Sequence, residues 1–228
     1  MKIYKYCLIA IIPLFLYACE KETEGLSKVT NPCEIELVGD ETVLVEIGTH
    51  YEELGYEAFE GGKDVSSAVV VSGTLNTNVL GRYTLRYTVS NSDNAVTVAK
   101  RTVIVFDPAS PTGFYKVSKD SYRNAPPSSE YATEPIVLVY QEESGAYFIS
   151  DLFGGYYAVG RGYGPFYATG GSVKINKENV VSLASSRTTP WGDKFSSVDG
   201  TYDAENQILN IVVDWEAGYT FYLILIKQ

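Results

Sequence analysis

The segment Arg82-Tyr-Thr-Leu-Arg-Tyr-Thr-Val89 alternates aromatic or apolar side chains with polar ones. A period of two residues is typical of a β-strand that buries one face, and here that face would hold Tyr83, Leu85, Tyr87 and Val89. Turn-forming residues follow at positions 90–94, and residues 96–106 return as a second apolar strand. The pattern therefore predicts a β-hairpin around which an all-β domain is built.

Residues 34–106 continue this pattern on the N-terminal side of the hairpin. Short alternating or apolar runs occur at 34–38, 42–47 and 68–71, separated by turn residues. Five to seven short strands in about 75 residues predict a small β-sandwich.

Several segments of the same region also resemble the bacterial immunoglobulin-like repeat, which occurs in insecticidal crystal proteins and in many surface lipoproteins. These segments are Tyr51-Glu-Glu-Leu-Gly-Tyr-Glu-Ala-Phe59, Gly62-Lys-Asp-Val65, Val71-Ser-Gly73, Gly81-Arg-Tyr-Thr-Leu-Arg-Tyr87 and Arg101-Thr-Val103. The resemblance implies a seven-stranded sandwich that serves as a spacer or adhesion module. It also implies that Tyr83, two residues after Gly81, forms a tyrosine corner, in which the phenol bonds to nearby backbone.

A joint rich in proline, Asp107-Pro-Ala-Ser-Pro-Thr-Gly113, marks the expected boundary of a second domain at 107–228. Residues 107–228 contain 20 Phe, Tyr or Trp residues, against 6 in residues 19–106, so the two regions differ in composition. Strands are predicted at 114–117, 136–141, 146–151, 173–176, 180–185, 200–203, 208–213 and 220–227. Hairpin turns at 142–145 and 203–206 indicate antiparallel neighbours, and about eight such strands predict a meander that closes, or nearly closes, into a β-barrel. In domain order and turn pattern, the region resembles the uncharacterised C-terminal domain of Bacteroides surface lipoproteins.

The N-terminus has the layout of a secretory signal. Lys2 and Lys5 precede an apolar run, residues 7–17, that is shorter than the roughly 20 residues of a membrane-spanning helix. The sequence Leu16-Tyr17-Ala18-Cys19 then resembles a bacterial lipobox. This resemblance implies a signal peptide at 1–18, cleavage after Ala18 and a lipid anchor on Cys19.

Residues 19–33 are polar and lack a hydrophobic period, which predicts a flexible tether behind the lipid. The acidic residues Glu20, Glu22 and Glu24 resemble the export signal of Bacteroidetes lipoproteins, which implies an outer-membrane protein facing the cell exterior. Alternatively, these residues only solvate the tether.

Charge and cysteine content exclude several classes of partner. Removing residues 1–18, which include Lys2 and Lys5, leaves 16 Lys and Arg against 28 Asp and Glu, a formal charge of −12. A surface this acidic disfavours nucleic acid, and we expect contact with the membrane through the N-terminal lipid alone. With Cys7 in the signal and Cys19 lipidated, Cys33 has no cysteine with which to form a disulfide or a thiol metal site.

The sequence offers no constellation for catalysis. Motifs for phosphate, zinc or calcium binding are absent, so we expect no cofactor and no metal. His50 is the single histidine, and no catalytic partner for it is evident. Asp214 and Glu216 share one strand face about 7 Å apart at most, and acids at such a spacing are ordinarily solvated. We therefore predict no catalytic residues and a protein that is not an enzyme.

The candidate ligand site is the glycine-rich and aromatic stretch 154–171. Glycine permits sharp, open backbone, and flat rings can stack on the apolar faces of sugars. Arg161 can donate hydrogen bonds to hydroxyls or to an acidic substituent. Trp191, among turn residues, and Trp215, at a strand end, are added as further platforms. The candidate residues are Tyr156, Tyr157, Arg161, Tyr163, Phe166, Tyr167, Trp191 and Trp215.

A second interpretation is that these rings fill the barrel and cover its end. Trp215 in particular is expected in the core. If the rings bind a ligand, the protein is a non-catalytic surface lipoprotein that recognises an extracellular ligand, most plausibly a glycan, with the immunoglobulin-like domain as spacer. The alternatives are an accessory subunit that binds a protein partner in an outer-membrane complex, and a barrel that holds a small apolar molecule.

Overall fold

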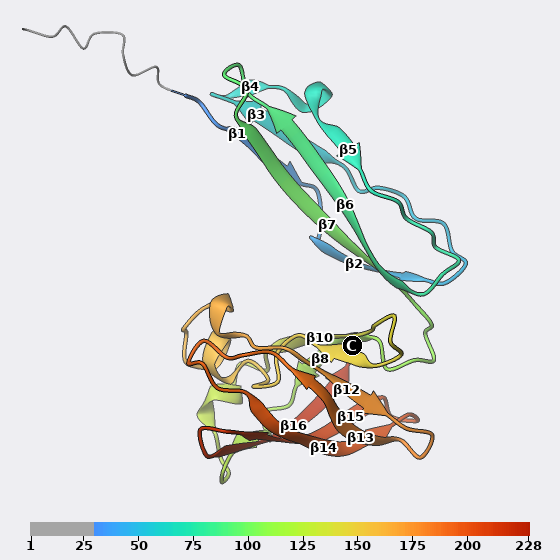
Figure 1. The fold of residues 1–228 in the computed structure, drawn as a ribbon, viewed down its shortest axis with the longest axis vertical. Helices are drawn as coiled ribbons and strands as arrows, with labels where there is room; N and C mark the ends of the chain where they lie inside the picture. Colours follow the sequence, from blue (N-terminus) through green and yellow to red (C-terminus); the bar gives the residue numbers. More distant parts are fainter. Residues whose placement is uncertain (1–29) are drawn as a thin grey trace, which may run out of the picture. The chain divides into compact units, whose positions relative to one another are not determined.

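The computed structural model describes residues 30–228, and β-strands account for nearly all of their regular structure (Figure 1). The predicted all-β fold is confirmed. Within residues 30–228, no helix has the length and apolar character needed to cross a membrane. The predicted signal peptide, Cys19, the acidic residues that follow it and most of the predicted tether lie outside the described residues.

The first seven strands form two sheets. One sheet has the order β1-β3-β4, with β1 at Cys33–Leu37, β3 at Tyr56–Glu60 and β4 at Lys63–Asp64. The other has the order β2-β7-β6-β5, with β2 at Thr42–Glu46, β7 at Val96–Phe106, β6 at Gly81–Ser90 and β5 at Val70–Ser72. Strand β2 pairs parallel with β7, and the other pairings are antiparallel. This is the seven-stranded sandwich that the family resemblance implied.

The hairpin β6–β7 has the predicted alternation. Leu85, Tyr87 and Val89 are buried, whereas Arg82, Thr84 and Arg86 are exposed. The two strands are paired from Gly81 opposite Val105 to Ser90 opposite Val96. The expected tyrosine corner is also present, since the hydroxyl of Tyr83 donates a 3.0 Å hydrogen bond to the carbonyl of Val79.

The sandwich contains a buried ion pair, which was not predicted from the sequence. The side chain of Arg101 on β7 is fully buried, and its Nε donates a 3.0 Å hydrogen bond to the carboxylate of Glu53. Its terminal nitrogens donate to the carbonyls of Asp40, Val38 and Gly55. Because a buried cation requires compensation, these acceptors allow arginine in place of an apolar residue.

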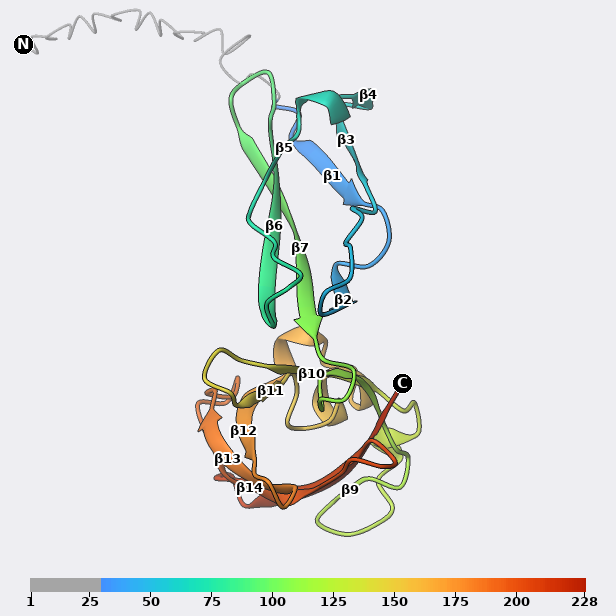
Figure 2. The same cartoon turned by 90° about the vertical axis from the view of Figure 1, so that its right-hand side faces the viewer.

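Eight further strands form a closed antiparallel barrel. They follow one another as β8 (Gly113–Val117), β10 (Ile136–Gln141), β11 (Tyr147–Ile149), β12 (Gly171–Ile175), β13 (Val180–Ser186), β14 (Phe195–Asp203), β15 (Ile208–Trp215) and β16 (Tyr219–Lys227). Each strand pairs with the next, and β16 pairs back with β8 (Figure 2). The predicted meander barrel is confirmed, with one more short strand, β9 (Tyr122–Arg123), added beside β16.

One barrel strand is longer than the sequence indicates. Strand β14 was expected to begin at Gly200, but it begins at Phe195. Its pairing with β15 shifts between Phe195 and Ser197, so an irregularity breaks the two-residue alternation there. The predicted turns at 142–145 and 203–206 do connect their strands, β10 to β11 and β14 to β15.

The interior of the barrel is filled by one continuous hydrophobic cluster that draws on every barrel strand. At one end, the fully buried ring of Phe153 lies 4.8 Å from Phe195, 5.1 Å from Phe221 and 5.2 Å from Trp215, centroid to centroid. Edge-to-face contacts of this kind stabilise aromatic cores beyond the burial of area. This aromatic end supports the segment 154–171.

Candidate functional site

A single buried carboxylate connects the two ends of the segment 154–171. Asp151 accepts hydrogen bonds from the backbone N–H groups of Phe153 (3.0 Å), Gly155 (2.9 Å) and Thr169 (3.2 Å). Burial raises the pKa of Asp151 to about 6, although these three N–H groups act in the opposite direction. The segment therefore leaves and re-enters the barrel at a fixed point.

The backbone between these ends forms short helical turns, which the sequence analysis did not foresee. Gly154 and Gly155 take left-handed backbone conformations, with φ of 61° and 81°. A π-helical turn, η3 (Tyr156–Gly160), and a 3-10 turn, η4 (Pro165–Tyr167), follow. A Cβ atom on Gly160 would clash with the carbonyl oxygen of Glu130, so this glycine permits close packing of the turn. Turns of five residues or fewer are too short to show a helical period.

Three of the predicted site residues lie in the core. Tyr156, Tyr157 and Trp215 are all buried and belong to the barrel cluster. The ring of Tyr157 lies 5.0 Å from Phe153, and that of Tyr156 lies 5.5 Å from Phe221. Burial of Trp215 agrees with the expectation that it is a core residue.

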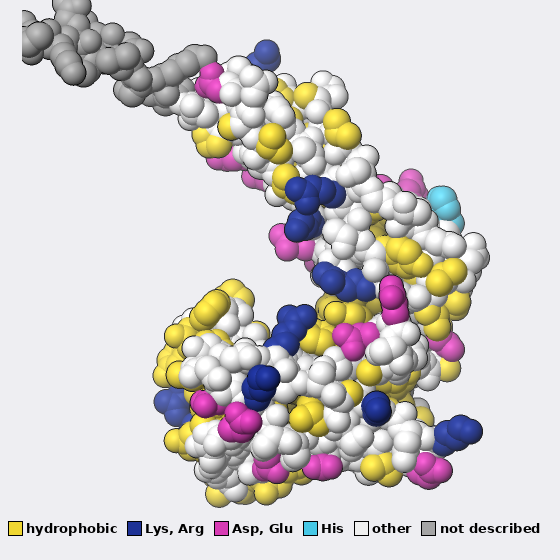
Figure 3. Space-filling view, in the orientation of Figure 1, with side chains coloured by type: hydrophobic (Ala, Val, Ile, Leu, Met, Phe, Trp, Pro, Cys, Tyr) yellow, Lys and Arg dark blue, Asp and Glu magenta, His cyan; other side chains and the backbone are white. Residues whose placement is uncertain are grey.

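The other predicted rings lie above this buried layer and reach the surface. The exposed fractions are 76% for Phe166, 50% for Tyr163 and 42% for Trp191, and Tyr219 on β16 adds a ring that is 37% exposed. Tyr167 is partly buried at their centre, 5.1 Å from both Tyr163 and Trp191 and 5.6 Å from Phe166. We call Tyr163, Phe166, Tyr167, Trp191 and Tyr219 the aromatic platform. Figure 3 shows hydrophobic side chains gathered on the flank of the barrel where Figure 1 draws the helical turns.

The buried layer fixes the platform from below. Trp191 lies 4.7 Å from Tyr157 and 5.3 Å from Trp215, while Tyr163 stacks on Tyr157 at 5.9 Å. Tyr219 contacts Trp215 at 5.7 Å. Tyr163, Trp191 and Tyr219 therefore each rest on a ring that is packed in the core, whereas Phe166 contacts the partly buried Tyr167.

Two arginines border the platform. Arg161, predicted from the sequence, forms a 2.8 Å ion pair with Glu130 and donates to the hydroxyl of Tyr156 at 3.3 Å. Burial alone would raise the pKa of Glu130, but a backbone hydrogen bond, Tyr156 and the charges of Arg161 and Arg123 together lower it. Arg123, on the unpredicted strand β9, lies with its guanidinium 4.8 Å from the ring of Tyr156 and 4.6 Å from that of Tyr219.

A hollow of about 370 Å³ adjoins the platform at Phe166. Its lining is Phe166, Ala168, Thr169, Arg187, Thr188, Thr189 and Pro190. The guanidinium of Arg187 lies 4.5 Å from the ring of Phe148. The hollow thus combines an apolar wall with hydroxyl and guanidinium donors, and its volume falls in the range of small-ligand sites.

The two acids at the end of β15 are occupied by hydrogen bonds. Asp214 accepts from the hydroxyls of Ser197 and Thr220, at 2.9 and 2.6 Å, and Glu216 accepts from the backbone N–H of Lys194 at 2.9 Å. Within residues 30–228, no group of three or more His, Cys, Asp or Glu side chains is arranged to hold a metal ion.

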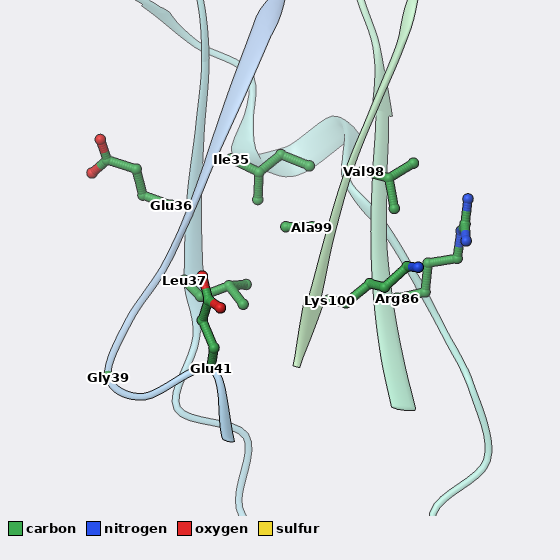
Figure 4. Close-up of a pocket in the computed structure, with 9 residues that line it drawn as sticks. All are labelled: Ile35, Glu36, Leu37, Gly39, Glu41, Arg86, Val98, Ala99 and Lys100. Carbon is green, nitrogen blue, oxygen red and sulfur yellow. The ribbon is translucent and has the colours of Figure 1, made fainter. Parts of the chain in front are cut away.

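The sandwich has a hollow of its own, of about 790 Å³, between β1 and β7. Figure 4 shows Ile35, Leu37 and Ala99 between the ribbons that border it, with Glu36 and Arg86 pointing away on opposite sides. None of the residues predicted to bind a ligand lines this hollow.

Comparisons with known proteins agree with the two-part fold. A family model for a C-terminal domain matches residues 107–227, and a model described as "Bacterial surface protein, Ig-like domain" matches residues 35–105. No curated protein matches the chain.

Among solved structures, the crystal structure of the lipoprotein BT2262 from Bacteroides thetaiotaomicron is similar, with 32% sequence identity and a TM-score of 0.68. The alignment covers 86% of this chain and 100% of that one. Another similar structure contains the M60 catalytic domain with the CBM51-1 and CBM51-2 domains of Clostridium perfringens ZmpB. Its sequence identity is 15% and its TM-score 0.31, and the alignment covers 82% of this chain and 14% of that one. A similarity that low has no bearing on the function of this chain.

Proposed function

We infer that this chain, which belongs to the family of the lipoprotein BT2262 from Bacteroides thetaiotaomicron, is a surface lipoprotein whose barrel binds an extracellular glycan. The observation that carries the proposal is the aromatic platform. Its rings reach solvent, and each is held from below by a buried aromatic residue or by a neighbouring platform ring. A rigid aromatic surface of this kind loses little conformational entropy when a ligand binds to it.

The chemistry of the surroundings suits a sugar. The C–H faces of a pyranose ring are apolar and stack on tyrosine or tryptophan, while the hydroxyls at its edge require hydrogen-bonding partners. Trp191 provides an exposed ring and follows Pro190, which lines the hollow together with Thr188 and Arg187. Phe166 provides the apolar wall of the same hollow.

Two other functions receive less support from the geometry. A barrel that holds a small apolar molecule needs internal space, whereas the interior here is filled by the barrel cluster. Glycoside hydrolysis needs two acids that face one cleft. Asp214, Glu216 and Glu130 are instead each bound to partners within the protein. We therefore propose a binding protein that is not an enzyme.

The proposal includes the position of the protein in the cell. Cleavage after Ala18 and a lipid on Cys19 would anchor the chain to the outer membrane, facing the exterior. The immunoglobulin-like sandwich would act as a spacer between this anchor and the barrel. An outer-membrane protein remains the alternative partner, and the exposed side chain of Phe166 is the feature that such a partner would cover.

The test uses the mature chain from residue 19, made soluble by Cys19→Ser. A panel of host and plant polysaccharides is titrated and followed by calorimetry and tryptophan fluorescence. We expect saturable binding to at least one polysaccharide, lost in Tyr163→Ala and Trp191→Ala but retained in Val180→Ala, which truncates an exposed apolar residue on β13. Absence of binding across the panel would contradict the proposal and favour a protein partner.

A further inference from the structure

We propose that the glycan carries an anionic group and that Arg123 binds this group at the edge of the aromatic platform. This inference rests on the proposed function and names the class of glycan. It arises from the guanidinium of Arg123, which is held in place by aromatic rings but forms no ion pair within residues 30–228.

The side chain of Arg123 is held by two aromatic rings and one hydrogen bond. Its guanidinium lies over the rings of both Tyr156 and Tyr219, with 4.8 and 4.6 Å to the ring centroids. Its Nη1 donates a 3.3 Å hydrogen bond to the hydroxyl of Tyr157. Its backbone N–H donates to the hydroxyl of Ser128 at 2.9 Å, which holds the short strand β9. The guanidinium therefore has one defined position.

Within residues 30–228, Arg123 forms no ion pair at salt-bridge distance, although the charges of Glu130 and Arg123 do attract each other. The nearby carboxylate of Glu130 is bound to Arg161 at 2.8 Å. The ion pairs among the described residues join Arg101 to Glu53, Lys116 to Glu134 and Arg161 to Glu130, and none includes Arg123. Cation–π contacts offset part of the cost of removing a guanidinium from water, but they leave most of its hydrogen-bonding capacity unused.

The ligand chemistry follows from the shape of the guanidinium. A planar guanidinium binds carboxylate and sulfate groups through paired hydrogen bonds, which a neutral hydroxyl cannot match. Because Tyr219 belongs to the platform and also contacts Arg123, a single pyranose could stack on the platform and place its anionic substituent beside Arg123. The substituent would be the carboxylate of a uronic acid or a sulfate ester.

Because the chain is acidic overall, a local positive charge at the platform is needed to bind an anionic glycan. A protein with a formal charge of −10 repels polyanions over most of its surface. Binding of an acidic glycan would therefore depend on a local cation, and removal of that one cation should have a large effect.

The experiment compares matched ligands that differ only in charge. Polygalacturonate and its methyl ester test the carboxylate, and chondroitin sulfate and desulfated chondroitin test the sulfate. Each is titrated calorimetrically into the mature chain with Cys19→Ser. We expect at least one anionic member to bind about tenfold or more tightly than its neutral or less charged counterpart.

Two substitutions of Arg123 test whether this residue causes the preference for the anionic ligand. Arg123→Gln should abolish the preference for the anionic ligand, and Arg123→Lys should retain part of it. Lys177→Gln removes one exposed positive charge elsewhere on the barrel and should leave the preference unchanged. Thermal unfolding of each variant verifies that it is folded.

The outcomes separate the two proposals. The anionic-group inference would be overturned, with glycan binding left in place, if the chain bound the charged and uncharged ligands of each pair with equal affinity and Arg123→Gln left these affinities unchanged. A preference that survives Arg123→Gln would also overturn it. Failure of the wild-type chain to bind any of these four ligands would overturn the anionic-group inference, and failure across the whole panel of host and plant polysaccharides would overturn the proposed function itself.

Discussion

The ring of Trp191 lies 5.3 Å from the ring of Trp215, yet the first is 42% exposed and the second 6% exposed. The pair therefore joins the surface of the aromatic platform to the core of the barrel. These are the 2 tryptophans of the chain, so its tryptophan fluorescence reports on this one location. A ligand stacked on Trp191 would change that signal directly.

The first prediction concerns the two tryptophans separately. In Trp215→Phe, which retains Trp191, we expect emission at long wavelength and strong quenching by acrylamide, because the indole contacts water. In Trp191→Phe, which retains Trp215, emission should be shifted to shorter wavelength and quenched little. Equal quenching in both variants would contradict the arrangement of the platform over a buried layer.

The second prediction concerns Asp151. In Asp151→Ala, three backbone N–H groups lose their acceptor in a buried site, and each loss costs about 1–3 kcal/mol. We expect the free energy of unfolding to fall by at least about 3 kcal/mol, measured by urea denaturation. Asp199→Ala, at an exposed position of β14, should change it little. A small loss in Asp151→Ala would mean that the segment 154–171 is held by other contacts.

The third prediction is the pH dependence of the same group. Because burial raises the pKa of Asp151 to about 6, the folded state binds this proton more tightly than the unfolded state does. The contribution of Asp151 to stability is therefore greatest below pH 4 and decreases as the pH rises to 6. Urea denaturation of the wild type and Asp151→Asn from pH 4 to 7 should show the advantage of the wild type shrinking with pH. An advantage that grows with pH would show that the three N–H groups outweigh burial.

The fourth prediction concerns the sandwich. Arg101→Met should lower the free energy of unfolding by about 3–5 kcal/mol, because it leaves the partly buried carboxylate of Glu53 without its cation. It also removes the donor to the carbonyls of Val38, Asp40 and Gly55. Lys100→Met, at the exposed neighbouring position, is the matched control. Equal stability of the two variants would show that the ion pair contributes nothing.

The fold was predictable because most strands bury one face. Alternation at Arg82–Val89 located the central hairpin, and the resemblance to the immunoglobulin-like repeat implied that Tyr83 bonds to nearby backbone, as it does to Val79. The alternation of apolar and polar residues did not predict the structure correctly where other interactions determine it. The pairing irregularity near Phe195 hid the first residues of β14, and the charge of Arg101 masked a position that faces the core.

The sequence predicted where the candidate site lies, but not which of its aromatic rings are buried and which are exposed. Glycine and aromatic content marked the segment 154–171, but composition does not distinguish a ring that faces solvent from one that faces the core. Tyr157 and Tyr163 occur in the same segment, yet the first is buried and the second is half-exposed. Arg123 and Tyr219 were missed because long-range pairing of β9 with β16 brings them to the platform, and β9 has only two residues.

The central claim is that the aromatic platform binds a glycan, and calorimetry of one matched pair tests it most directly. The mature chain with Cys19→Ser and its Trp191→Ala variant are titrated with the polysaccharide that gives the strongest fluorescence change. The account predicts saturable heat for the first and an affinity at least about tenfold weaker for the second, a difference of about 1.4 kcal/mol, with both proteins folded. Identical isotherms for the two proteins, or no heat with either across the panel, would contradict it.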